Sequence, residues 1–338
     1  MIGRLLKRPR PQVDEPAPSA VVVTRGGMTE SVHAVAACVT GAGGHAASES
    51  SPGAGALEVF VRSSAKPLQA LAAVERGVLE ALGLDDRHLA VACASHDSSV
   101  EPVGLVAEIL AAAGLAEPAL RCGIATPLDR GVAAQLAGEL RPIHHNCSGK
   151  HALGLALCVH EGWSTGDYLD PMHPLQEAMR TTVAEALGAR PSEGVDGCGM
   201  RAYRVPLTRL AAGFGRLAGG GLGAAGDRVA AAMAANPRLL GRAGGIDVEL
   251  MRAVPGLVAK LGAEGVVGAG TADGRGVAVK ILDGAHRALD PAAVEAVRHG
   301  LRIEAPGDAL DALAAPTVKT ARGDEAGTVA VELSWHPV

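Results

Sequence analysis

One serine and one lysine stand in a pattern that suits covalent catalysis. In the string VFVRSSAKP, Ser63 and Lys66 follow the apolar stretch Val59–Val61 and precede a helical pattern. On a helix this spacing puts both side chains on one face, and backbone N–H groups at a helix start favour negative charge near the serine hydroxyl. Burial lowers the pKa of a lysine, which lets its neutral amine accept the hydroxyl proton. The pattern therefore predicts a serine nucleophile with a lysine base; the alternative is a helix cap at Ser63 beside a solvated lysine.

A second serine and a second lysine could belong to the same site. Ser95 follows the apolar run Leu89–Ala94, and Lys280 lies alone inside the apolar segment Val277–Leu282. A buried lysine is costly unless it is paired or neutralised, so Lys280 needs a partner and Ser95 is a candidate. The alternative is a lysine at a strand edge whose amine reaches water.

Two glycine-flanked turns concentrate possible metal ligands. The strings HHNCSGKH (His144–His151) and DGCG (Asp196–Gly199) each contain one cysteine. Cys147 and Cys198 with one nitrogen donor could form a tetrahedral zinc site. The alternative is a pair of buried thiols without a ligand.

Strand patterns gather at both ends of the chain and helical patterns fill its middle. The segments with β-branched residues between turn signals are Ala20–Arg25, His33–Thr40, Leu57–Arg62, Leu89–Ala94, Gly276–Asp283 and Gly327–Trp335. The segments with apolar residues at helical spacing are Pro67–Leu82, Glu101–Ala113, Lys150–Glu161, Pro174–Leu187 and Asp227–Ala235. The glycine-rich run Gly213–Gly226 predicts a flexible connection. This order favours an α/β fold, with an antiparallel sheet built from both chain ends and an inserted helical region.

Length and composition set the class of protein. The 338 residues are 48% hydrophobic and 20% charged, which is enough apolar surface to form a sizeable core. We expect a single catalytic domain over residues 19–338, with a helical subregion at about 100–260, after a disordered tail over residues 1–18. The net charge of −5 and the six aromatic residues (two each of Trp, Tyr and Phe) argue against nucleic acid as a partner.

The expected location is the cytoplasm. The most apolar windows are far shorter than the roughly 20 residues that a bilayer requires, so no membrane partner is expected. Charged residues and prolines follow the basic start where a secretory apolar segment would lie. Six cysteines are sparse for this length, and in the cytosol they would be reduced.

Taken together, these segments resemble the rhizobial-type (class 3, asparaginase II) L-asparaginase family. The matching strings are VTRGGMTESVH (Val23–His33), VRSSAKPLQAL (Val61–Leu71), ASH (Ala94–His96), HNCSGKHA (His145–Ala152), HPLQ (His173–Gln176), DGCG (Asp196–Gly199), KLGAEGV (Lys260–Val266) and VKILDG (Val279–Gly284). The resemblance implies a fold like that of serine β-lactamases and related glutaminases, a homodimer, and hydrolysis of L-asparagine to L-aspartate and ammonia.

The resemblance also implies roles for individual residues. Ser63 and Lys66 match the nucleophilic pair of the family, and Ser95 and Lys280 match its second Ser–Lys pair. The residues that match its zinc ligands are Cys147, Lys150 and Cys198. The residues that match positions near the site, which bind or orient substrate, are Arg62, His151 and Asp196.

Two segments depart from the family pattern, at residues 97–102 and 124–126. They leave open a non-catalytic amino-acid-binding homologue, or an amidohydrolase with a shifted substrate. Two other enzyme classes stay open on chemistry alone. One is a zinc hydrolase whose metal generates hydroxide, and the other is a penicillin-binding or β-lactamase activity that uses the Ser-x-x-Lys pair.

Overall fold

An antiparallel sheet joins the two ends of the chain. The computed structural model describes residues 19–338, and the predicted tail over residues 1–18 lies outside the described residues. Strand β1 (Ala20–Arg25) pairs with β2 (Met28–Thr40) on one side and with β11 (Glu325–Glu332) on the other. Strand β2 then pairs with β9 (Gly276–Ile281). The expected mixed α/β architecture, with a sheet drawn from both chain ends, is confirmed.

The remaining strands extend this sheet and form a second, smaller one. The main path runs β10-β11-β1-β2-β9-β8-β7, so that β7 is an edge strand. The other strands of the main sheet are β3 (Ala46–Glu49), β7 (Val258–Gly262), β8 (Val266–Gly270), β10 (Thr317–Lys319) and β12 (His336–Pro337). The small sheet has the order β4-β6-β5 and consists of β4 (Glu58–Phe60), β5 (Ser192–Val195) and β6 (Arg201–Pro206).

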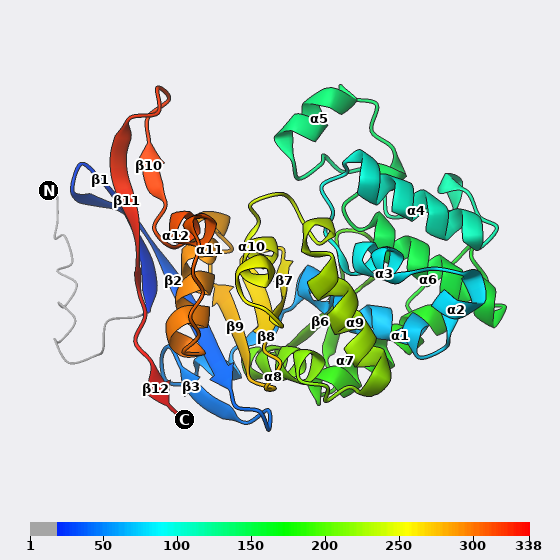
Figure 1. Cartoon of the computed structure of the whole chain (residues 1–338), viewed down its shortest axis with the longest axis horizontal. Coiled ribbons are helices and arrows are strands. Elements are labelled where there is room, and N and C mark those ends of the chain that lie inside the picture. Colours follow the sequence, from blue (N-terminus) through cyan, green and yellow to red (C-terminus); the bar gives the residue numbers. More distant parts are fainter. Residues whose placement is uncertain (1–18) are drawn as a thin grey trace, which may run out of the picture.

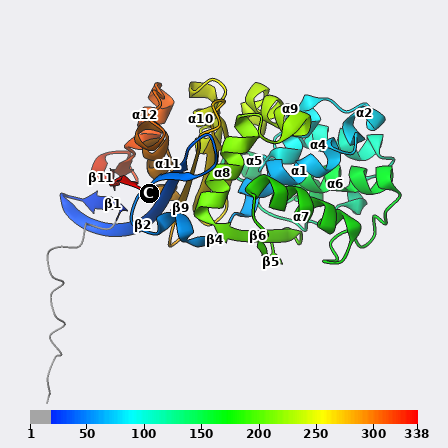
Figure 2. The same cartoon turned by 90° about the horizontal axis from the view of Figure 1, so that it is seen from below.

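Most helices lie at the end of the molecule that is remote from β1 and β11, as Figures 1 and 2 both show. The helices before β5 are α1 (Lys66–Val74), α2 (Val78–Leu82), α3 (Asp86–Cys93), α4 (Val100–Ala112), α5 (Arg130–Leu136), α6 (Ser148–Glu161) and α7 (Pro174–Leu187). Those after β6 are α8 (Leu207–Ala218), α9 (Gly223–Ala235), α10 (Ile246–Ala253), α11 (His286–Glu295) and α12 (Asp308–Ala314). Helix α8 packs on β8 and β9, and α11 packs on β9 and β11. Across residues 19–338, every helix is too short or too polar to cross a membrane.

One predicted strand is a helix. The segment Leu89–Ala94 forms most of α3, because Asp85 caps the helix start by accepting the backbone N–H groups of Arg87 and His88. A short apolar run does not distinguish a buried helix from a buried strand. By contrast, the ranges predicted for β1 and α7 are confirmed to the residue.

The prediction of a flexible connection at Gly213–Gly226 is wrong. Helix α8 runs through to Ala218 and α9 begins at Gly223. Glycines at this contact let the helix touch the sheet backbone to backbone. A Cβ on Gly215 of α8 would lie 2.5 Å from the Gly274 carbonyl just before β9, and a Cβ on Gly276 of β9 would collide with the Ala211 carbonyl of α8. The glycines therefore serve close packing.

We expect Gly276→Ala to destabilise the fold. The added methyl must push α8 away from β9, and overpacking of this kind costs roughly 1–3 kcal/mol. Gly104→Ala is the matched control, because a Cβ there meets nothing within 4 Å and the residue lies inside α4. That change should be neutral or stabilise by up to about 1 kcal/mol. Urea unfolding of the two variants measures both effects, and equal midpoints would contradict the packing argument.

Candidate active site

A cavity of about 800 Å³ lies where the sheet edge meets the helical region. Its lining includes the predicted residues Ser63 and Ser95, together with Asn146, Asp247 and Lys260. The volume falls in the range of small-molecule sites. The walls come from the turn before α1, the segment after α3, the end of β7 and the start of α10.

Ser63 and Lys66 lie on consecutive helical turns at this cavity. The 3₁₀ turn η2 (Arg62–Ala65) runs directly into α1, and Pro67 favours the helix start. Ser63 lines the cavity, whereas Lys66 is fully buried beneath it. The structure gives no hydrogen bond between the two side chains within residues 19–338. Lys66 contacts Ser95 instead.

The Lys66 amine is surrounded by uncharged acceptors. Its Nζ donates to the Ala94 carbonyl at 2.5 Å, to the Ser95 hydroxyl at 3.0 Å and to the Asn146 carbonyl at 3.3 Å. Burial lowers the pKa of Lys66, the Cys147 thiol opposes that shift, and the positive charge of Lys150 adds to it. Burial therefore shifts Lys66 toward the neutral amine that a base requires, while the three acceptors, which together need the three protons of an ammonium group, oppose that shift.

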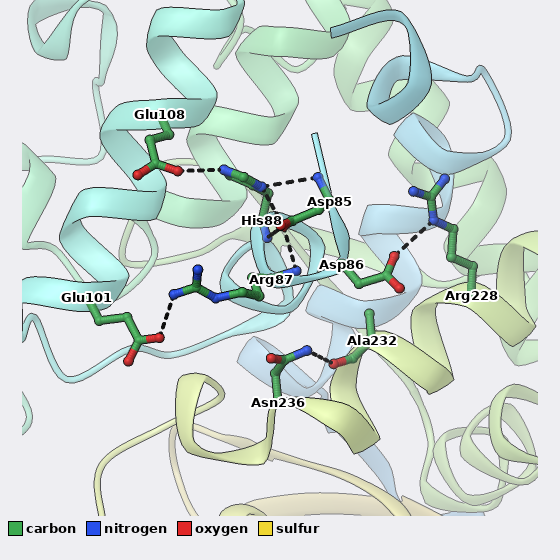
Figure 3. A network of polar contacts seen from close by, with 9 residues as sticks. All are labelled: Asp85, Asp86, Arg87, His88, Glu101, Glu108, Arg228, Ala232 and Asn236. Atoms are coloured by element: carbon green, nitrogen blue, oxygen red, sulfur yellow. Dashed lines mark hydrogen bonds and ion pairs between the residues drawn. The ribbon is translucent and has the colours of Figure 1, made fainter. Parts of the chain in front are cut away.

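Ser95 owes its position to helix α3, which ends two residues before it. Figure 3 shows the polar contacts that hold this helix between α4 and α9. Within them, His88 contacts Glu108 of α4 at 2.9 Å, and Arg228 of α9 pairs with Asp86 at 3.2 Å. After α3 the chain turns to an extended conformation at Ala94, and the Ser95 N–H donates to the Leu240 carbonyl. The serine is thus fixed at the cavity by its backbone.

A second lysine belongs to the cavity, and sequence reasoning gave it no role. Lys260 lies in edge strand β7 and lines the cavity, and its Nζ lies 2.5 Å from the Asp247 carboxylate. Both side chains are almost completely buried, with exposed fractions of 0% and 1%. The same carboxylate accepts the Leu261 N–H at 3.1 Å. The signal was available, because Lys260 begins one of the strings that carry the family resemblance.

Lys280 does not meet Ser95, and the predicted pairing is corrected. Its Nζ donates to the backbone carbonyls of Glu264 and Ile281, and it lines a separate hollow beside β4. The reason is strand order: Lys280 lies in β9, and β8 separates that strand from β7 at the cavity. The lysine that lies at the cavity with Ser95 is Lys260.

The two thiol-bearing turns come together behind the cavity wall. Cys147 precedes α6, and its thiol is hydrogen-bonded to that of Cys198. Lys150 Nζ lies 3.3 Å from the Cys198 sulfur. Asn146, the residue before Cys147, lines the cavity. The structure therefore brings Cys147, Lys150 and Cys198 into one cluster beside the catalytic candidates.

One member of this cluster, Cys198, is held in the deprotonated form that a metal ligand needs, whereas the pKa values of Cys147 and Lys150 are raised. The hydrogen bond from Cys147 lowers the pKa of Cys198 to about 5, burial opposes that shift, and the charge of Lys150 adds to it. Two sulfurs and one amine form a donor set that zinc accepts, with a further position free for another ligand. Counting only His, Cys, Asp and Glu, no group of three is placed to hold a metal in the described part of the chain, so a site here depends on the lysine nitrogen.

The predicted substrate-binding residues lie beside the thiol cluster. Arg62 donates from Nε to Asp196 at 2.9 Å and has a φ of 50°, a left-handed conformation that is uncommon for a residue with a side chain. His151 is fully buried, and its Nδ1 lies 2.7 Å from the Tyr168 hydroxyl. Burial and the charge of Lys150 lower the pKa of His151 to about 3. Its Nε2 has no hydrogen-bond partner within residues 19–338, but the side chain is closed off from solvent, and none of Arg62, His151 and Asp196 lines the cavity.

Comparison with known proteins gives one match by family. A family model described as L-asparaginase II matches residues 21–331. No curated protein matches the chain. Two solved structures of Mglu share 15% sequence identity with it: the L-glutamate binding form, with a TM-score of 0.39, and the native form, with a TM-score of 0.36, each in 4.3 M NaCl. The alignments cover 81% of this chain, but only 61% and 62% of those chains.

We expect Asp247→Ala to destabilise the protein strongly. The change leaves the Lys260 ammonium buried without its counter-ion, which costs about 3–5 kcal/mol. Glu30→Ala is the control, because Glu30 pairs with Arg25 in a solvent-exposed contact. Its unfolding midpoint should stay close to that of the wild type. Chemical denaturation compares the two variants, and similar small losses would show that the buried ion pair is dispensable.

Proposed function

The chain belongs to the L-asparaginase II family, and from this premise we propose that it hydrolyses L-asparagine to L-aspartate and ammonia through an acyl-enzyme on Ser63. The single observation that carries the proposal is the buried Lys66 amine, held by neutral acceptors directly beneath a cavity that Ser63, Ser95 and Lys260 line. The family membership supports an amidohydrolase with a small-molecule substrate. Asparagine as that substrate and the Ser–Lys mechanism are the proposal.

In the first step Lys66 takes the proton of the Ser63 hydroxyl, and the serine oxygen attacks the side-chain amide carbon of asparagine. The carbonyl oxygen becomes an oxyanion. Backbone N–H groups of the first helical turn lack partners inside the helix, and we assign the N–H of Ser63 to the stabilisation of this oxyanion. Each such donor is worth roughly 3 kcal/mol in the transition state.

In the second step the C–N bond breaks and ammonia leaves with a proton. Lys66 supplies that proton through the Ser95 hydroxyl, which lies 3.0 Å from Lys66 Nζ and lines the cavity. Lys260 takes the place that sequence reasoning gave to Lys280: its ammonium, held by Asp247, is the fixed positive charge of the relay. Water then hydrolyses the aspartyl ester, with Lys66 as the base again.

Zinc, if bound, would be held by Cys147, Lys150 and Cys198 and would shape or tune the substrate pocket as a Lewis acid. Arg62, His151 and Asp196 do not line the cavity, so they would act on the substrate through the turns that carry Ser63 and Cys198. The finer expectations stay predictions: a single catalytic domain over residues 19–338, a fold like that of serine β-lactamases, a homodimer and a cytoplasmic location.

We predict that Ser63→Ala abolishes ammonia release from asparagine while the fold persists, because the nucleophile is removed from a half-buried position. Ser64→Ala is the matched control. Its hydroxyl donates to the Val61 carbonyl and does not line the cavity, so that variant should keep most of the turnover. Coupled ammonia assays and circular dichroism measure the two effects. Near-normal turnover of Ser63→Ala would refute the nucleophile assignment.

Ser95 is the competing nucleophile, because it is the serine that contacts Lys66 directly. Mass spectrometry of enzyme quenched during turnover locates the aspartyl ester on one peptide or the other. We expect the added mass on the peptide that contains Ser63. An adduct on Ser95 would reverse the roles of the two serines.

We predict that Cys198→Ser lowers the zinc content of the purified protein, since a soft sulfur donor is lost. Ser63→Ala should keep its zinc and lose its activity, which would disfavour a zinc hydrolase. Elemental analysis and ammonia release are measured on the same samples. A Ser63→Ala variant that keeps zinc-dependent turnover would favour the metal-hydroxide mechanism, and asparagine binding without any turnover would favour a non-catalytic homologue.

A further inference from the structure

The active-site cavity is lined by four charged side chains that the proposed chemistry does not use: Asp129, Arg130, Arg242 and Asp290. Of the two carboxylates, Asp129 already accepts the Gly131 and Val132 N–H groups at the start of α5. Asp290 and Arg242 both line it, together with Ser63 and Lys260. Asp290 lies in α11, and Arg242 lies in the loop before α10. Neither residue was singled out from the sequence.

The Asp290 carboxylate is half-buried and uncommitted. Within residues 19–338 the structure gives its side chain no hydrogen bond and no ion pair. Burial raises the pKa of Asp290 to about 6, Arg242 opposes the shift and Asp247 adds to it. A carboxylate with reduced hydration that faces a cavity favours a cation there.

The Arg242 guanidinium is also uncommitted in the described part of the chain, although its backbone is fixed. The Arg242 carbonyl accepts the Gly245 N–H at 3.0 Å, which closes the loop before α10. Asp247, two residues further on, is already occupied by Lys260. The donors of Arg242 are thus free to bind a carboxylate from solution.

The positive charge of Arg242 opposes the rise that burial causes in the pKa of Asp290. No contact within 4.0 Å joins the two side chains in the described part of the chain, so they do not form an ion pair. A negative and a positive group set apart across one cavity match a zwitterion. In an α-amino acid the ammonium and the carboxylate share one carbon atom, while a side-chain amide extends away from both.

We propose that Asp290 binds the α-ammonium group and Arg242 the α-carboxylate of the substrate, which restricts the enzyme to side-chain amides of α-amino acids. The assignment rests on the proposed function, because it directs the amide toward Ser63. Both are specificity-determining residues and take no part in bond breaking.

The test compares L-asparagine with succinamate, which has the same amide and carboxylate and lacks the α-amino group. Asp290→Asn should raise the KM for asparagine about 10-fold or more, the effect of losing one charged hydrogen-bonding partner, with little change in kcat. Its KM for succinamate should not change. Arg242→Met should raise the KM for both substrates, and the control Asp311→Asn, which alters a surface partner of Arg298, should change neither.

Two results would overturn the assignment. One is an unchanged KM for asparagine in Asp290→Asn, and the other is an equal rise for asparagine and succinamate, which would mean that the carboxylate only supports the cavity. Titration calorimetry with L-aspartate and succinate separates this inference from the proposed function. If the wild type releases no ammonia but binds L-aspartate, and Asp290→Asn binds it about 10-fold more weakly with succinate unaffected, recognition stands and the hydrolase proposal fails. If the wild type does not bind L-aspartate, the recognition proposal fails as well.

Discussion

The fully buried amine of Lys66 determines which groups can surround it. An ammonium without partners in an apolar interior is very costly, and Lys66 has three acceptors, the carbonyls of Ala94 and Asn146 and the hydroxyl of Ser95. Ala94 and Ser95 follow α3 and Asn146 precedes α6, so the Lys66 amine connects α1 to the ends of two other helices. Because the acceptors are uncharged, they stabilise the charged form of the amine less than a carboxylate would.

Two lysines at one cavity acquire different roles from their partners. The Nζ atom of Lys260 lies 2.5 Å from the Asp247 carboxylate, so Lys260 has a charged partner that Lys66 lacks. The Leu261 N–H binds the same carboxylate and locks it to the sheet edge. Ser95 contacts Lys66, the amine whose pKa is lowered by burial, and Lys260 lies at the same cavity. A site that must both accept and deliver protons requires such a division.

The sequence predicts which chemical groups form this site better than it predicts how those groups are arranged in space. Ser63 and Lys66 are neighbours along one helix, so their shared location follows from local spacing. Lys260 and Lys280 both lie in apolar strands near the C-terminal end, and the pattern around each is similar. Only the order of β9, β8 and β7 decides which of them reaches the cavity, and strand order depends on contacts between distant segments. The glycine-rich sequence of α8 led to the wrong prediction of a flexible connection for the same reason, because the packing partners of these glycines lie in other elements.

The position of Ser63, the proposed nucleophile, depends on contacts with both sheets. A Cβ at Gly262 of β7 would lie 2.7 Å from the Val61 carbonyl and 3.3 Å from the Ser64 nitrogen, so only glycine lets the turn Arg62–Ala65 pack against the edge of the main sheet. On its other side the turn is held through Arg62, whose left-handed backbone is kept in place by Asp196. Asp196 belongs to the same short turn as Cys198. A ligand on the thiol cluster would therefore influence Ser63 through this backbone even without touching the substrate, as the proposed tuning of the site by zinc requires.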